Sequence, residues 1–240
     1  MKKEQERVRD LKNMIINDKK KTADDEDSKR EKQDASGQDI GEREKKIKSQ
    51  EEKYRELIRQ NPDFVGWLSI EGTKVDYPVV QRKNEESYYL RRDFYGDYSI
   101  SGTLFLSAGS DIWLPTDNLI IYGHRMSDGS MFGDLSKYED ENYYNEHRSI
   151  VFSSLKEEAR YEVAFVFYDR IHSKDYDGFV YYKFTEAENE YEYKSYINAC
   201  KEKSLIKSGL DPKYGDKLLT LSTCSYHETD GRFVVIAVKK

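Results

Sequence analysis

The chain has 240 residues, of which 36% are charged, and its formal net charge at pH 7 is -6. This length allows one large domain or two small ones, and the mild acidity argues against nucleic-acid binding, which requires a basic surface. The two cysteines, Cys200 and Cys224, are too few for a disulfide framework. No stretch approaches the ~20 consecutive apolar residues that a membrane-spanning helix needs.

The beginning of the chain differs in composition from the rest, because all 20 Tyr, 10 Phe and 2 Trp lie at or after Tyr54. A charged segment without aromatic residues buries too little apolar surface to offset the entropy of ordering it. We therefore predict a charged, flexible leader or spacer over residues 1–40. A thin apolar stripe then indicates a helix over residues 41–60, which Asn61-Pro62 ends.

Residues 64–240 contain eight segments with the alternation or the apolar run of β-strands. These are 64–70, 74–81, 102–108, 117–124, 149–155, 160–171, 217–224 and 232–238. Helical segments are expected at 131–147 and 186–206, and a short helical or irregular connection is expected at 87–94. Few helices and no strand–helix–strand rhythm predict a mainly β fold, a closed and mainly antiparallel barrel.

The last two strands read as a hairpin with Cys224 at the end of its first arm and Arg232 at the start of its second. A cysteine after an apolar strand can be a small buried hydrophobe, but Cys224 lies where the strand gives way to a polar loop. A thiolate is the nucleophilic form of cysteine, and a nearby cation favours it. The fork of donors on an arginine also fits a developing oxyanion.

His124 ends another apolar strand, after Gly123, which we expect to give the backbone freedom. A lone histidine is more often a hydrogen-bonded structural residue. However, a histidine and a cysteine at strand ends and an arginine at a strand start suit one rim of one barrel. A cysteine enzyme needs such a base or acid to exchange protons with its nucleophile and its leaving group.

The other histidines offer weaker alternatives. His227 follows Cys224 at a metal-compatible spacing, but with His124 these make only three ligands, one fewer than a structural zinc site uses. We expect no metal and no cofactor. His147 and His172 lie in charged surroundings and are predicted to be solvated, whereas Cys200 falls on the apolar side of its predicted helix and should be inert core.

These motifs resemble those of the sortases, cysteine transpeptidases of Gram-positive bacteria. TLSTC, which ends at Cys224, matches the family signature TLxTC, followed by an arginine on the next strand, and its serine points to class B. IIYGHRM around His124, GTLFLS and the upstream NPDFVGWLSIEGTKVDYPVVQ match further blocks in the same order. The long insert between Tyr168 and Lys217 is similar to the class B loop before the cysteine strand. The resemblance covers residues 42–240.

The resemblance implies an eight-stranded sortase barrel with an N-terminal helix and a helix in that long loop. Residues 41–240 would form the catalytic domain, with the helix at 41–60 and the barrel at 64–240. It also implies that Cys224 is the nucleophile, His124 the acid/base and Arg232 the oxyanion or substrate clamp. By the same resemblance we expect four residues to bind substrate: Ser222, Leu90, Phe179 and Val180.

The implied reaction cleaves a C-terminal sorting signal after Thr through a thioacyl intermediate and joins the protein to a cell-wall amine. Its partners would be sorting-signal-bearing surface proteins and a cell-wall precursor amine, with a signal that is either NPQTN-like or PxTG-like. We expect a monomer on the outer face of the membrane. Family members begin with a hydrophobic signal anchor, which this sequence lacks, so it is either truncated or anchored differently, and the leader resembles the spacer after such an anchor.

Two other hypotheses stay open at this point. The same scaffold could be a cysteine endopeptidase that releases its product to water. It could also be a catalytically silent peptide-binding barrel, which alkylation or substitution of Cys224 would distinguish from an enzyme.

Overall fold

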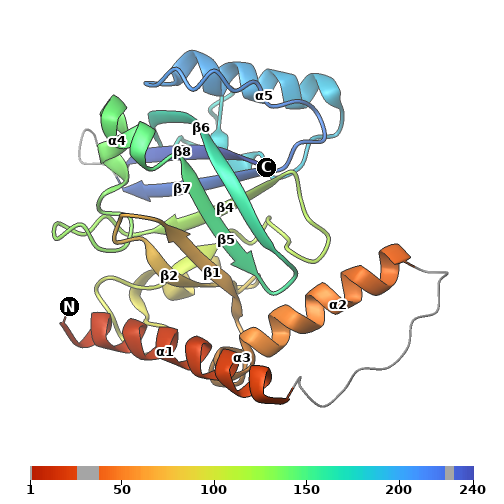
Figure 1. The fold of residues 1–240 in the computed structure, drawn as a ribbon. Coiled ribbons are helices and arrows are strands. Elements are labelled where there is room, and N and C mark those ends of the chain that lie inside the picture. The colour runs from red at the N-terminus through yellow and green to blue at the C-terminus, as the bar shows by residue number, and fades with distance from the viewer. Residues whose placement is uncertain (1, 26–37, 225–229) are drawn as a thin grey trace.

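The structure is a computed structural model that describes residues 2–25, 38–224 and 230–240. Its centre is a closed barrel of eight strands. Figure 1 shows the strands wound into one barrel with helices at its outside. The strands are β1 (Phe64–Ile70), β2 (Asp76–Val80), β3 (Leu104–Leu106), β4 (Asn118–Gly123), β5 (Ser149–Ser154), β6 (Glu158–Arg170), β7 (Leu218–Cys224) and β8 (Gly231–Lys239). All eight predicted strands are present.

The strands pair in the order β1-β2-β3-β4-β7-β8-β6-β5, and β5 returns to β1. The pairs β2–β3 and β4–β7 are parallel, and the others are antiparallel. The predicted mainly antiparallel closed barrel is therefore confirmed. The parallel pairing of β4 with β7 was not predicted, because its paired residues, such as Asn118 and Leu218, are 100 positions apart in the chain and leave no local pattern in the sequence.

The barrel has an apolar interior and a second apolar layer outside it. Alternate residues of β7 are buried in different layers: Leu219 and Leu221 belong to the interior cluster, whereas Leu218 belongs to the outer one. The outer layer is covered by helix α5 (Glu190–Lys203), which buries Tyr193, Tyr196, Ile197 and Cys200. The strands are thus buried on both faces here, which explains their continuous apolar runs.

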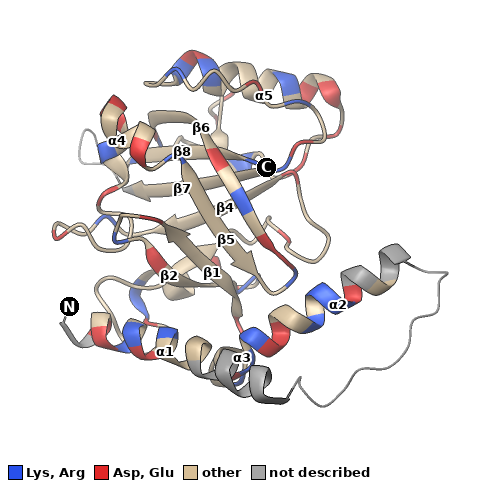
Figure 2. Cartoon of the chain, viewed as in Figure 1, with Lys and Arg blue, Asp and Glu red and all other residues tan. Residues whose placement is uncertain are grey.

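The remaining helices lie at the periphery. They are α1 (Lys2–Asp25), α2 (Gln38–Lys53), α3 (Arg55–Gln60), η2 (Glu86–Arg91), η3 (Leu135–Glu139), α4 (Glu141–Glu146) and η4 (Tyr181–Lys183). Figure 1 shows α1 and α3 against one end of the barrel and α2 projecting from it. In Figure 2 most charged residues lie on helices and loops, and the strands are mostly uncharged. No helix in the described ranges is long and apolar enough to cross a membrane.

The N-terminal segment differs from the flexible leader that the composition predicts. Residues 26–37 lie outside the described part of the chain, but Lys2–Asp25 form a helix that packs on the barrel. Leu11 is fully buried and Ile15 is 9% exposed. Together with Val8, these residues repeat at helical spacing and join the interior cluster. An apolar stripe this narrow, among so many charges, does not stabilise a helix by itself. The helix becomes stable through its contact with the barrel.

The burial of α1 can be tested by truncating its apolar stripe. We predict that Leu11→Ala lowers the free energy of unfolding by about 2–5 kcal/mol, because it leaves a cavity under the helix. Ile16, on the same helix, is 46% exposed, so Ile16→Ala should change it by less than about 0.5 kcal/mol. Urea unfolding followed by circular dichroism measures both. Equal effects of the two substitutions would show that α1 does not dock through Leu11.

Candidate active site

The strand register brings the three predicted catalytic residues to one rim of the barrel. β7 pairs with β4 up to Thr223 opposite Gly123, so His124 and Cys224 are the next residues of two neighbouring strands. On its other side, Cys224 lies directly opposite Arg232 of β8. The backbone of Cys224 is described, whereas its side chain and residues 225–229, which include His227, are outside the described part. The backbone therefore places positions 124, 224 and 232 in a row.

Gly123 is needed for space rather than for backbone freedom. A Cβ atom at this position would lie 2.4 Å from Leu104 Cδ2 and 2.7 Å from Phe132 Cδ2, and both distances are far shorter than van der Waals contact. The close packing of β4 on these two side chains fixes the end of the strand, from which His124 projects.

The imidazole of His124 is held by a backbone carbonyl. Its Nε2 atom lies 2.7 Å from the carbonyl oxygen of Leu90, at the end of η2. A carbonyl oxygen can only accept a hydrogen bond, so Nε2 carries the proton that it donates. In the neutral ring, Nδ1 is therefore the basic nitrogen, and the Leu90 carbonyl selects this tautomer.

Burial lowers the pKa of His124 below its ordinary value of 6.5, and the positive charge of Arg91 lowers it further, against the opposing effect of the Leu90 bond. A histidine with a lowered pKa is neutral at pH 7. It can then accept a proton at Nδ1, as a general base must.

Arg232 is half-buried, and its guanidinium turns back to its own strand. Nη1 donates to the carbonyl oxygens of Asp230, at 3.1 Å, and Gly231, at 2.9 Å. Among the described residues, none accepts from Nε or Nη2, and no carboxylate forms an ion pair with this arginine. Within the described ranges, donors of a permanent cation are therefore left for a ligand.

These residues open onto a groove of about 300 Å³, the size of a small ligand pocket. Its walls are mostly apolar and aromatic, with charges only at a few positions. It is lined by Glu86, Ser87, Leu90, Phe105, Tyr122, Gly123, His124, Ile171, Tyr182, Ser222, Thr223 and Arg232.

Two of the four residues expected to bind substrate lie in the groove. Leu90 is 38% exposed there, whereas Ser222 is 1% exposed and its Oγ atom is bonded to Tyr181 Oη at 2.7 Å. Phe179 and Val180 are not among the residues that line it. Phe179 instead packs against Phe167 and Tyr196 beneath α5.

Sequence reasoning missed Tyr122, Ile171 and Tyr182, which line the groove. Tyr122 had a usable signal, because it is two residues before His124 on the same strand and so shares its face. Ile171 and Tyr182 had none, since they lie at either end of an irregular stretch whose folding depends on long-range contacts.

A family model of the sortase domain matches residues 68–240 of the chain. Sortase B of Staphylococcus aureus (strain NCTC 8325 / PS 47) is 32% identical over 186 residues, which make up 77% of this chain and 73% of the relative. A crystal structure of sortase B from B. anthracis is similar with a TM-score of 0.69 and 34% identity, covering 78% of this chain and 84% of that one. The chain belongs to the sortase family.

The relatives and solved structures are of class B, so the protein is a class B sortase-type cysteine transpeptidase. A Staphylococcus aureus sortase B–substrate complex resembles it with a TM-score of 0.71 and 28% identity over 85% of this chain and 96% of that chain. Sortases of this class act at the cell envelope of Gram-positive bacteria, on substrates with sorting signals and on amine acceptors. The resemblance in the motifs is thereby confirmed.

In this sortase, two histidines expected to be solvated are held by the fold. His172 is bonded through Nε2 to Asp169 Oδ1 at 2.9 Å, and the histidine side chain is only 10% exposed. Asp169 is the residue opposite Arg232 on β6, but its carboxylate contacts His172 and Lys203. The Nδ1 atom of His147 contacts the Glu71 carbonyl at 2.9 Å. Cys200 is fully buried, as predicted for inert core, and burial raises the pKa of its thiol.

The protonation state of His124 gives a testable prediction. In a Cys224→Ala variant, which removes coupling to the thiol, NMR titration should give His124 a pKa below 6.5. As the pH falls below 6.5, the histidine of the unfolded chain then takes up its proton before that of the folded chain. Acidification below pH 6.5 therefore lowers the free energy of unfolding through His124, whereas His124 has no such effect above that pH. A His124→Gln variant should show a shallower decline between pH 7 and 5. A His124 pKa above 6.5 would contradict the predicted burial effect.

Proposed function

We propose that Cys224, His124 and Arg232 carry out the transpeptidase reaction, with Cys224 as the nucleophile. The observation that supports this is the shared register of β4, β7 and β8, which aligns the three positions in one row. Ser222 and Thr223, the two residues before Cys224 on β7, line the groove, so this end of the strand lies at the groove. A nucleophile there would reach a peptide lying between His124 and Arg232.

In the first half of the reaction, the sorting signal lies in the groove and its Thr carbonyl carbon is attacked by the Cys224 sulfur. The thiol proton passes to His124, and His124 then gives a proton to the departing amine when the peptide bond breaks. Because Nε2 is engaged with Leu90, Nδ1 carries this proton in both directions. The product is a thioacyl enzyme with a neutral His124.

Arg232 stabilises the oxygen that becomes negative in each tetrahedral intermediate. Its Nη1 atom is held by the carbonyls of the two preceding residues, Asp230 and Gly231, which orients the guanidinium before substrate arrives. Nε and Nη2 then face no described acceptor and are available to the substrate. A preorganised cation at such a position acts mainly on the transition state.

In the second half, a cell-wall precursor amine enters, gives a proton to His124 and attacks the thioacyl carbon, releasing Cys224. The apolar lining of the groove favours aminolysis by limiting water. We propose substrate contacts for Leu90 and Ser222, which line the groove, and for Phe179 and Val180, which lie outside it. The enzyme is a monomer at the outer face of the membrane. Its substrates are surface proteins with an NPQTN-like or PxTG-like signal. Its catalytic unit comprises residues 41–240.

A peptide cleavage assay with and without an added primary amine tests the function. We predict an amine-ligated product from one of the two signal types, and none from Cys224→Ala. Cys200→Ala, which removes the buried cysteine, should keep the activity. Cleavage without ligation would indicate an endopeptidase, and cleavage by Cys224→Ala would exclude Cys224 as the nucleophile.

For the clamp, Arg232→Lys should lower kcat about a hundredfold, because one ammonium cannot reproduce the fork of donors. The matched control is Arg160→Lys on β6, where the arginine is exposed and bonded to Ser149. Steady-state kinetics compare both variants with the parent. Full activity in Arg232→Lys would remove this residue from the mechanism.

A further inference from the structure

The Leu90 carbonyl that holds His124 belongs to a stretch of backbone fixed on both sides. The carbonyl before it, of Tyr89, accepts the N–H of Thr103 at 3.1 Å. The carbonyl after it, of Arg91, accepts the N–H of Ser99 at 3.0 Å. Both donors come from the segment 92–103, here called the 92–103 loop. The loop therefore sets the direction in which the Leu90 oxygen points.

The loop also lies against this backbone with no space to spare. Gly102 has a φ of +62°, and a Cβ atom there would come within 2.6 Å of the Tyr89 oxygen and 2.7 Å of the Leu90 oxygen. Only glycine tolerates both this conformation and this approach. Because the contact is so close, a shift of the loop displaces the carbonyl that orients His124.

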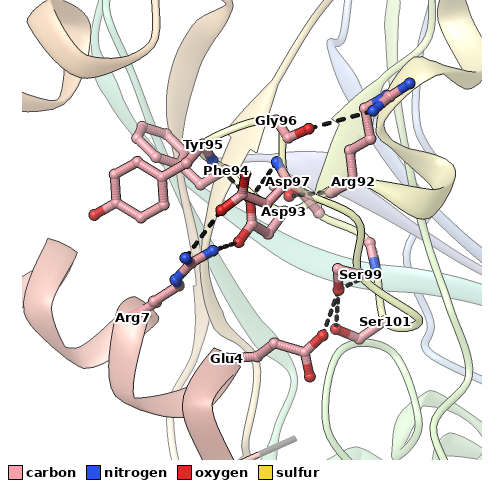
Figure 3. Close-up of polar contacts among 12 residues, drawn as sticks. Glu4, Arg7, Arg92, Asp93, Phe94, Tyr95, Gly96, Asp97, Ser99 and Ser101 are labelled. Atoms are coloured by element: carbon pink, nitrogen blue, oxygen red, sulfur yellow. Dashed lines mark hydrogen bonds and ion pairs between the residues drawn. The ribbon is translucent and has the colours of Figure 1, made fainter.

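Helix α1 holds the loop at two points, as Figure 3 shows. Arg7 forms ion pairs with Asp93, through Nη1, and with Asp97, whose Oδ2 lies 2.9 Å from Nη2. Glu4 Oε1 accepts a hydrogen bond from Ser99 Oγ at 2.5 Å. The Ser99 hydroxyl oxygen also accepts the N–H of Gly102 at 3.1 Å. Ser99 thus links helix α1 to Gly102, the residue that lies against the Leu90 carbonyl.

Asp93 couples the conformation of the loop to Arg7. Its side chain is 11% exposed, and its Oδ1 atom accepts the N–H groups of Tyr95 and Asp97, each at 3.0 Å. Without Arg7, this carboxylate would be nearly buried without its cation, which is costly. The carboxylates of Asp97 and Asp93 in turn raise the pKa of Arg7. The loop conformation and the docking of α1 therefore depend on the same carboxylate.

We propose that Glu4 and Arg7 are positioning residues for the His124 step: α1 holds the 92–103 loop, and the loop holds the Leu90 carbonyl that selects the Nδ1-basic tautomer of His124. The inference rests on the proposed acid/base role of His124. It also gives the N-terminal helix a supporting contact to the catalytic unit of residues 41–240, in place of the role of a spacer.

The experiment compares three variants of the full chain with a matched control on the same helix. Arg7→Ala, Glu4→Ala and Ser99→Ala each remove one link, and Arg7→Lys keeps the charge. The control is Lys12→Ala, which removes an α1 cation paired with Asp76 of β2, away from the loop. Steady-state kinetics on a sorting peptide give kcat and KM, and nitrogen-15 NMR of the imidazole reports the His124 tautomer without turnover.

We expect each of the three link variants to lower kcat roughly tenfold with KM changed less than about twofold, since a small misplacement of a catalytic group is costly. Their NMR spectra should lose the single Nε2–H tautomer. Lys12→Ala should match the parent in both measurements, and Arg7→Lys should recover part of the loss. Ser99→Ala removes no charge, so it serves as the test if Arg7→Ala fails to fold.

Two outcomes would overturn the proposal. One is a parent-like kcat and tautomer in folded Arg7→Ala or Ser99→Ala. The other is an equal loss in Lys12→Ala, which would mean that α1 contributes only general stability. A failure of the proposed function can be distinguished from a failure of this inference. Full transpeptidation by His124→Gln would exclude the acid/base role of His124. The NMR spectra of the Arg7 and Ser99 variants would still decide whether α1 sets the tautomer.

Discussion

The double pairing of β7 is the constraint on which the site depends. This strand pairs in parallel with β4 and in antiparallel fashion with β8, so the ends of both neighbours are aligned with Cys224. A slip of one residue in either pairing would turn a side chain to the opposite face of the barrel. The two apolar layers prevent such a slip, because alternate residues of β7 are buried inside the barrel and beneath α5.

The histidine side of the row is supported by the packing at Gly123 and, in addition, by a backbone carbonyl. His124 and Leu90 are 34 residues apart, and the carbonyl of Leu90 is held through the 92–103 loop by contacts that begin at α1. The tautomer of one imidazole is thus coupled to a helix at the N-terminal end of the chain. The arginine side is simpler, since Arg232 is oriented by carbonyls of its own hairpin.

The sequence predicted the barrel well because its strands are buried on one or both faces and therefore alternate or form apolar runs. It also predicted His124, Cys224 and Arg232, which combine a reactive side chain with a position at a strand end. The N-terminal helix was missed for a physical reason. Val8, Leu11 and Ile15 have helical spacing, but a stripe of three residues in a charged segment is stable only against a surface, and composition does not reveal that surface.

By itself, the sequence determined the eight strands, the chemical types in the site and the family to which its motifs point. These are local properties: alternation, residue type and short motifs. Only the tertiary structure decided which nitrogen of His124 is basic, that Gly123 is required by packing, that Tyr122 and Tyr182 line the groove, and that α1 contacts the 92–103 loop. Each of these depends on groups that are far apart in the chain and that meet only when the barrel closes.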